Sequence, residues 1–188
     1  MPNLKEVRNR IASVNSTMQI TSAMKMVSAA KLRRAQDAII QMRPYAEKLQ
    51  EILINLSAGL DASEGIYSQQ REEKNILLVS ITSNRGLCGA FNANIIKKTK
   101  ALVSRFEQED KEVKVLCIGK KTEDVFKKTP NYYTEAGTEL GKLFDALVYD
   151  NVAPIAEHLM AQFAEGNFDK IILVYNKFKN AASQIIMD

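Results

Sequence analysis

The sequence predicts an α/β fold preceded by one long N-terminal helix of the coiled-coil type. Residues 1–58 contain no glycine and follow a regular apolar rhythm, whereas short apolar stretches alternate with helical patterns from residue 75 onward. A chain of 188 residues is long enough for one domain with a sizeable core and an appendage. We therefore expect a shaft helix over residues 1–58, a linker over 59–74 and an α/β domain over 75–188.

The apolar positions of the first segment recur in alternating steps of three and four residues, which is the pattern of a coiled-coil seam. One step is short after Thr21, as at a local phase slip of a supercoil. The helix would be roughly 80 Å long, so its apolar partner must come from outside its own domain. Pro44 lies within the pattern without changing its phase, which predicts a continuous helix. The predicted seam includes Leu4, Val7, Ile11, Val14, Met18, Ala35, Met42, Leu49 and Ile52.

From residue 75 the apolar stretches read as strands and the segments between them as helices. We expect strands over residues 75–83, 114–118 and 170–176, a short edge strand over 131–134 and a further strand from 184. The expected helices cover residues 92–109, 119–128 and 138–166, the last interrupted between Tyr149 and Pro154 because proline disfavours helix before it. This alternation predicts a mostly parallel, Rossmann-like sheet with flanking helices.

Positive charge is concentrated in the long helix. Residues 1–50 hold nine Lys and Arg against three acidic residues, although the whole chain has a net charge of only +4. The partner of the helix should therefore be acidic, whether nucleic acid, an anionic membrane surface or acidic loops of another protein. The densest cluster consists of Lys25, Lys31, Arg33 and Arg34, and together with the adjacent Met24 it is here called the collar.

Small side chains surround the collar and leave a smooth surface. Charge runs are usually no more than solvated helix faces. Here, however, alanine and serine occupy most neighbouring positions. A smooth basic surface of this kind suits close contact with an acidic protein without tight binding. We interpret the collar as a contact surface for an acidic protein partner.

Other chemistry is weakly represented. The apolar runs are too short to span a bilayer, and the first residues resemble neither a signal peptide nor a transit segment. The two cysteines, Cys88 and Cys117, suggest a reducing, cytoplasmic compartment, and neither they nor the single His158 has metal-ligand spacing. We expect no catalytic residues, no metal site and no cofactor.

Two alternative functions remain open from the residues. Gly86 and Gly89 lie between a predicted strand and a helix, the layout of a phosphate-binding turn, but they fit neither G-x-G-x-x-G nor a Walker A loop. We interpret them as a structural turn, with a nucleotide-binding enzyme as the alternative. A basic helical arm that binds nucleic acid is the other alternative, although the basic residues are interspersed with alanine, methionine and serine.

Three segments resemble the gamma subunit of F-type ATP synthases. Residues 6–36 (EVRNRIASVNSTMQITSAMKMVSAAKLRRAQ) resemble its N-terminal helix, residues 83–92 (SNRGLCGAFN) the loop after its first strand, and residues 173–178 (LVYNKF) a later strand. The resemblance implies the N-terminal part of such a subunit, without the family's long C-terminal helix. The family's fold is a shaft of two antiparallel helices inside a hexamer of alpha and beta subunits, with the α/β domain below.

The resemblance also implies a function and partners. The expected function is that of a non-catalytic central-stalk rotor that couples proton flow to ATP synthesis or hydrolysis. Met24 and Lys25 match the position where the shaft meets acidic loops of the beta subunits, and Lys31, Arg33 and Arg34 continue that surface. Further implied partners are the epsilon subunit and the membrane rotor ring, at the cytoplasmic face of the bacterial inner membrane. We expect no nucleic-acid partner, no insertion into the membrane, and self-association through the N-terminal helix when no other partner covers the seam.

Overall fold

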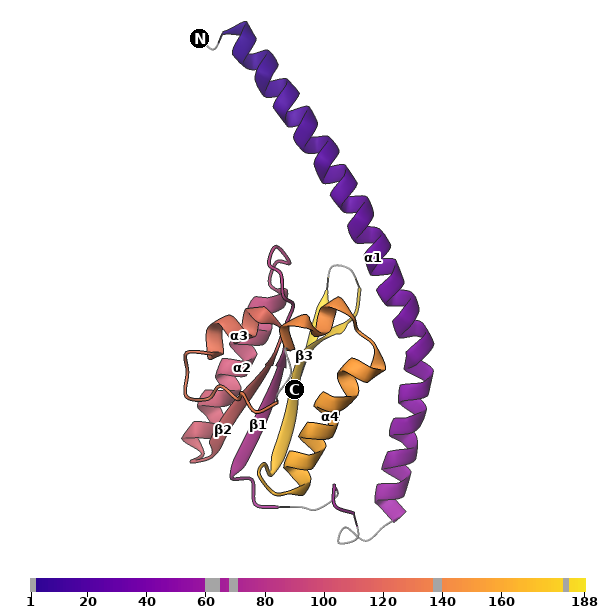
Figure 1. Ribbon diagram of the computed structural model, residues 1–188, viewed down its shortest axis with the longest axis vertical. Helices are drawn as coiled ribbons and strands as arrows, with labels where there is room; N and C mark the ends of the chain where they lie inside the picture. The colour runs from indigo at the N-terminus through magenta and orange to yellow at the C-terminus, as the bar shows by residue number, and fades with distance from the viewer. Residues whose placement is uncertain (1–2, 60–64, 68–70, 137–139, 181–182) are drawn as a thin grey trace. The chain divides into compact units, whose positions relative to one another are not determined.

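The computed structural model describes residues 3–59, 65–67, 71–136, 140–180 and 183–188. The chain forms two compact units, Met1–Asp61 and Ala62–Asp188, which are described separately. The first contains one long helix, and the second contains the sheet with its flanking helices (Figure 1). Among the described residues, no helix is both long enough and apolar enough to cross a membrane.

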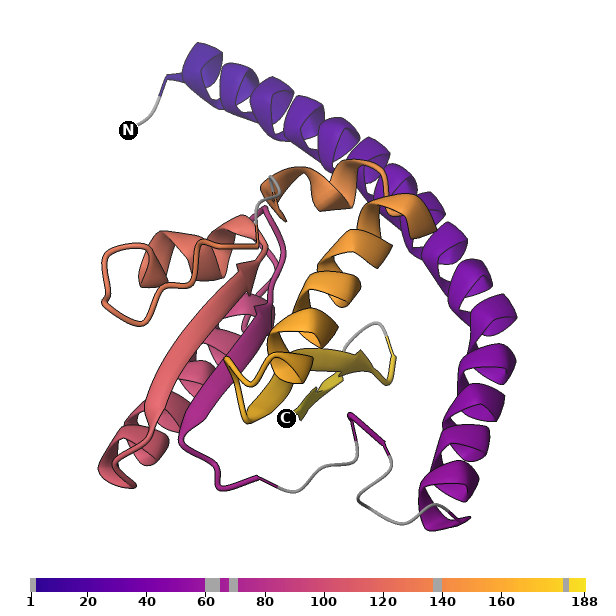
Figure 2. The same cartoon turned by 60° about the horizontal axis from the view of Figure 1, so that its bottom comes forward.

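The first unit is built on helix α1, which runs without interruption from Leu4 to Gly59 and includes Pro44. The predicted single helix is confirmed, since the seam keeps its phase through the proline. The hydroxyls of Thr17 and Thr21 donate to the carbonyls four residues earlier, at 2.9 and 2.8 Å. Such bonds and an internal proline both tend to bend a helix, and α1 curves along its length (Figure 2).

The second unit contains a four-stranded sheet in the order β2-β1-β3-β4. Strand β1 (Asn75–Ile81) is central and pairs in parallel with β2 (Glu112–Ile118) and with β3 (Lys170–Phe178). Strand β4 (Gln184–Met187) pairs antiparallel with β3. The predicted mostly parallel α/β sheet is confirmed, and the apolar run Ile76–Val79 is fully buried because helices cover both of its faces.

The side chains of β1 alternate between two hydrophobic clusters, one on each face. Ile76 and Leu78 pack with residues of α2 (Phe91–Gln108) and α3 (Lys120–Phe126). Leu77 and Val79 belong to the cluster that includes Ile155 of α4 (Tyr149–Ala164), and Leu140 of the short 3₁₀ helix η1 (Leu140–Asp145) packs against it. This is the period-two burial expected of a central strand.

The helical segment predicted over residues 138–166 is interrupted, as expected, but the interruption predicted between Tyr149 and Pro154 lies earlier in the chain. The chain forms η1 and α4, and the break lies before Tyr149, at the extended residue Val148, while Pro154 lies inside α4. Pro154 removes one N–H, but Asp150, whose carbonyl loses that bond, is exposed near the helix start, where water can replace it. The start predicted at Thr138 lies outside the described residues.

The edge strand predicted over residues 131–134 is reduced to one parallel bridge between Tyr132 and Val115. Asn131 explains why pairing stops there. Its side-chain amide donates to the carbonyl of Val113 at 3.1 Å, so a side chain occupies an acceptor that a longer strand would use. Segment 131–133 still covers the outer edge of β2 at this point, through the bonds of Val115 N to Asn131 O and of Tyr133 N to Val115 O.

Candidate interaction surface of the N-terminal helix

The side chains of α1 are displayed almost completely to solvent. Every described side chain of residues 3–56 is exposed except that of Gln36, which is half-buried. The exposed set includes large apolar residues of the predicted seam, such as Leu4 at 75%, Val14 at 60% and Met18 at 62%. Water contact on this scale is unfavourable for a stripe of apolar side chains, so a partner that covered α1 would be stabilised by burying them.

All predicted seam residues lie on α1, and no second helix of the first unit packs against them within the described residues. Val7, Ile11, Met42, Leu49 and Ile52 are exposed by 41–64%. Ala35 is also exposed. The pairing of this seam with another helix stays a prediction.

The collar is exposed and is not neutralised by neighbouring acids. Residues 7–36 contain no Asp or Glu, so Lys25 and Lys31 have no acidic neighbour at helical spacing. Asp37 follows Arg33 and Arg34 by four and three residues, but in the described part of α1 it forms no ion pair with either. Along the described part of α1, the ion pair present is Lys48–Glu51, at 2.8 Å, and it lies outside the collar. A field of one sign therefore surrounds this part of the helix, which favours an acidic partner.

The four cations of the collar point in different directions. An α-helix advances about 100° per residue, so relative to Lys25 the side chains of Arg33, Arg34 and Lys31 lie at about 80°, 180° and 240° around the axis. They span ten residues, or about 15 Å of helix. No sector wider than about 120° lacks a cation, so the collar presents positive charge on every side of α1.

Met24 lies on the same stripe of the helix as Lys31, seven residues and nearly two turns later. Its side chain is 63% exposed. Small residues such as Ser28 and Ala35 continue that stripe, so the surface between the charges is low and partly apolar. Such a surface allows a partner to approach closely without a deep pocket to lock into.

The turn that contains Gly86 and Gly89 lies at the carboxyl end of β1 in the second unit. Asn92, at the start of α2, organises it: its side-chain oxygen accepts the Ser83 N–H at 2.9 Å, and its amide donates to the Arg85 carbonyl at 3.1 Å. Gly89 has φ +58°, a left-handed conformation that favours glycine. These contacts are compatible with a structural role of the turn, which stays a prediction.

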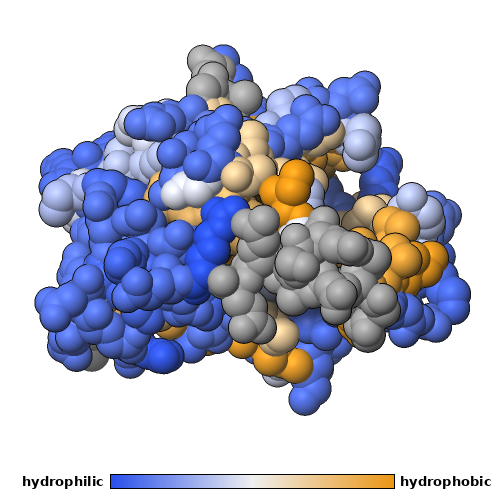
Figure 3. Space-filling view, turned by 90° about the horizontal axis from the view of Figure 1, so that it is seen from below, coloured by the Kyte–Doolittle hydropathy of each residue, from blue (hydrophilic) through white to orange (hydrophobic). Residues whose placement is uncertain are grey.

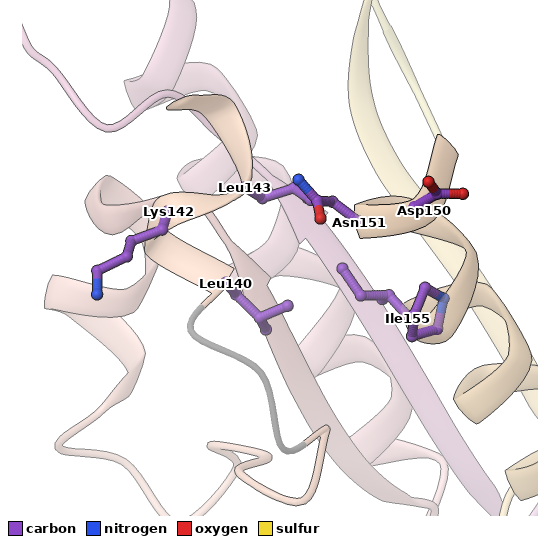
Figure 4. A pocket seen from close by; sticks show the side chains of 7 residues that line it. Leu140, Lys142, Leu143, Asp150, Asn151 and Ile155 are labelled. Atoms are coloured by element: carbon purple, nitrogen blue, oxygen red, sulfur yellow. The ribbon is translucent and has the colours of Figure 1, made fainter. Parts of the chain in front are cut away.

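A separate cavity of about 270 Å³ lies between η1 and α4 (Figure 4). Leu140 and Ile155 point toward each other across it, whereas Lys142 points away. Its charged groups do not converge on a common point, and the Gly86/Gly89 turn does not line it. No group of three or more potential metal ligands occurs among the described residues.

Sequence reasoning missed one set of contacts in the polar segment that follows α1. Arg71, assigned to a linker because its neighbourhood is polar, lies against Phe163 of α4. The sequence signal that could have indicated this attachment is the presence of one aromatic residue, Tyr67, and one arginine, Arg71, in the mainly polar segment 59–74.

Comparison with known proteins provides independent information. A family model described as ATP synthase matches residues 3–187. The ATP synthase gamma chain of Flavobacterium johnsoniae is 58% identical over 187 residues, covering 99% of this chain and 63% of that protein. The ATP synthase gamma chain of Chlorobium phaeobacteroides is 45% identical, again covering 99% of this chain and 63% of the relative. The chain thus spans a little under two thirds of the length of these relatives.

Solved structures with a similar fold come from the same type of assembly. A chain in the structure of the Tetrahymena thermophila mitochondrial ATP synthase central stalk and c-ring superposes with a TM-score of 0.63 and 26% identity. The match covers 89% of this chain and 69% of that one. A chain of the Euglena gracilis mitochondrial ATP synthase, at 22% identity and a TM-score of 0.53, shares the fold and covers 95% of this chain and 54% of its own.

Proposed function

The chain belongs to the gamma-chain family of ATP synthases, and we propose on that basis that it acts in the central stalk as a rotor. In this role it couples proton flow through the membrane sector to ATP synthesis or hydrolysis by mechanical contact. The observation that carries the proposal is the collar, an exposed set of cations on an acid-free stretch of α1.

The proposed mechanism is asymmetric contact with several copies of one acidic partner. A curved shaft inside a ring of catalytic subunits touches each of them differently at any moment. Each orientation of the shaft therefore stabilises a different set of catalytic-site conformations. The shift in each conformational equilibrium cannot exceed the difference between the shaft's contact energies with the two conformations. To switch one site fully requires about 5.5 kcal/mol, which many weak contacts along the collar could supply while each remains easy to break.

The arrangement of the collar suits this mechanism. Because cations point in all directions from the helix axis, each acidic subunit around the shaft meets positive charge in every orientation. Attraction of this kind is long-ranged and tolerant of geometry, unlike a fitted pocket. Met24 adds an apolar contact that does not require a fixed charge partner.

The partners we propose are the alpha and beta subunits of the catalytic hexamer around α1, and the epsilon subunit and membrane rotor ring at the second unit. This chain is non-catalytic in that assembly and is attached peripherally at the cytoplasmic face of the bacterial inner membrane. Support for the assembly comes from the similar chain in the Tetrahymena thermophila structure, which is described as central stalk and c-ring.

Neither alternative function is favoured by the structure. Phosphate neutralisation on a duplex depends on many cations in a dense stripe, whereas the basic residues of α1 are interspersed with alanine, methionine and serine. The hydrogen bonds of Asn92 explain the conformation of the Gly86/Gly89 turn, so a bound nucleotide is not needed to account for it.

Co-purification tests the proposal. Full-length gamma chain carrying this sequence should retain alpha and beta subunits at low ionic strength, and the variant K31E/R33E/R34E should lose most of that retention. The matched control K97E/K100E/K128E makes the same charge change at exposed positions of the second unit. Equal retention by the two variants, or tight salt-sensitive binding of duplex DNA in place of the subunits, would contradict the proposed role.

A further inference from the structure

The segment that enters the sheet is fastened to α4. The guanidinium Nη1 of Arg71 donates a hydrogen bond to the carbonyl oxygen of Phe163 at 2.8 Å. The same guanidinium lies 5.0 Å from the centre of the Phe163 ring, within the range of a cation–π contact. The ring of Tyr67 stacks against Phe163 at a centroid distance of 6.3 Å. Arg71 and Phe163 are 92 residues apart in sequence, so this is tertiary attachment.

Arg71 supplies what the end of α4 lacks. The last carbonyls of a helix have no partner within it and carry partial negative charge, which a cation near the C-terminus stabilises. The last turn of α4 contains no basic residue of its own. The half-buried Arg71 provides both the donor and the charge from a distant segment.

A second attachment lies two residues later, at the amino ends of the strands. The carboxylate of Glu73 contacts the ammonium of Lys170 at 2.7 Å and that of Lys111 at 3.2 Å. The hydrogen bond from Lys170 lowers the pKa of Glu73 below its ordinary value, and the hydrogen bond from Lys111 adds a smaller effect in the same direction. Glu73 thereby joins the start of β3 to the residue before β2.

The backbone of the same segment is held by Asp169. One oxygen of its carboxylate accepts the N–H groups of Lys74 and Asn75, at 3.0 and 2.8 Å. Figure 3 looks toward the end of the molecule where the strands begin and shows mainly hydrophilic residues there. Residues 71–74, here called the strap, are thus tied to the second unit by side-chain and backbone contacts.

We infer that Arg71 is a positioning residue that keeps the strap rigid on the second unit, so that rotation of this unit is passed on to α1. The inference rests on the proposed rotor function. A free connector would let one unit turn while the other lags, whereas residues 71–74 cannot turn independently of the second unit because they are fastened to it. Glu73 and Asp169 assist by fixing the segment that follows.

The first test uses the 188-residue chain alone and does not depend on the rotor function. Cleavage after Glu72 by a glutamate-specific protease, under native conditions, reports opening of the strap. R71A should raise the cleavage rate roughly tenfold, because a charge-assisted hydrogen bond to a half-buried carbonyl is lost. R71K should restore part of the protection. K74A is the control. The ion pair that it removes joins Lys74 to Glu72 within the strap and does not attach the strap to the rest of the second unit, so the cleavage rate should stay unchanged. An unchanged rate for R71A would overturn the inference.

The second test separates positioning from stability. In vesicles with the assembled synthase, R71A should reduce protons pumped per ATP hydrolysed about twofold or more, with R71K intermediate. The comparison variant V125A, within α3, weakens packing against the core and should lower thermal stability without changing this ratio. A normal ratio for R71A despite faster strap cleavage would overturn the mechanical role. Failure of the parent chain to assemble would count against the proposed function instead, and the cleavage result would stand.

Discussion

The carbonyl oxygen of Thr82 lies only 2.1 Å from the point that a Cβ atom at residue 119 would occupy. Gly119 follows β2 directly and has φ +107°, which side chains rarely tolerate. The absence of a side chain lets the end of β1 approach the start of α3, where the hydroxyl of Thr122 donates to that of Thr82 at 2.8 Å. Both threonines are buried, so this contact satisfies polar groups that would otherwise destabilise the core.

Gly119→Ala should destabilise the second unit by about 2–4 kcal/mol, because the new methyl group collides with backbone and the conformation is strained. Equilibrium denaturation by urea measures the change. Gly141→Ala provides the control, since a Cβ there meets open space, and should change the free energy of unfolding by less than about 0.5 kcal/mol. Similar effects of the two substitutions would show that the close approach at Gly119 does not matter.

The two cysteines should differ sharply in reactivity. Burial raises the pKa of the Cys117 thiol from its ordinary value of 9.0 to about 12, and the nearby Glu123 carboxylate adds to the shift. A thiol reagent at pH 8 should therefore label the exposed Cys88 in the native protein and leave Cys117 unmodified until unfolding, as mass spectrometry can show. Equal labelling rates would contradict the buried position of Cys117.

The same shift predicts a pH dependence of stability. The folded state holds the Cys117 proton more tightly than the unfolded state, so this contribution is complete below pH 9 and is lost as the pH rises toward 12. Denaturation of Cys117→Ala should lose less stability over that range than the parent protein does. Identical alkaline profiles would exclude the contribution.

Self-association should depend on the exposed seam of α1. We expect the 188-residue chain to associate at micromolar concentrations in sedimentation experiments, because apolar residues such as Ile11 avoid water when a second helix is available. Ile11→Glu should weaken this association at least about tenfold, whereas Ser13→Glu, off the seam, should not. A strictly monomeric chain whose whole α1 resists hydrogen exchange would refute the prediction.

The second unit should fold without α1. A chain of residues 62–188 contains both hydrophobic clusters and the strap, and we expect a cooperative unfolding transition close to that of the second unit in the whole chain. A chain of residues 75–188, which lacks Arg71 and Glu73, should be less stable. Circular dichroism during denaturation measures both, and an unfolded 62–188 chain would mean that α1 belongs to the core.

Much of the fold could be predicted because it depends on local patterns. The long helix follows from a seam uninterrupted by glycine, and β1 from an apolar run bounded by polar residues. The exposure of the collar was also predictable, since lysine and arginine at every angle of a helix cannot all be buried.

The features that escaped prediction depend on contacts between distant segments. Gly119 reads as an ordinary glycine after a strand until the position of Thr82 is known. Arg71 reads as part of a polar connector because the carbonyl that it caps lies in α4. The break in the last helical segment was expected between Tyr149 and Pro154 but lies before Tyr149, because Pro154, the obvious helix breaker, is tolerated near an exposed helix start.

The most direct test of the rotor account is the coupling of a synthase whose gamma chain carries Met24→Lys. The new ammonium beside Lys25 would add a charge-assisted contact to acidic loops of the catalytic subunits, worth roughly 1.5–3 kcal/mol, and this contact must break whenever the shaft turns. Replacement of Lys31 or Arg33 by Ala should have the milder opposite effect. Met42→Lys is the matched control, because Met42 is 64% exposed, against 63% for Met24, but lies five turns further along α1. The account predicts that Met24→Lys leaves assembly intact and lowers ATP-driven proton pumping well below the Met42→Lys value, measured in the same reconstituted vesicles. Normal turnover and normal pumping for Met24→Lys would show that the collar is not where the shaft meets the catalytic subunits.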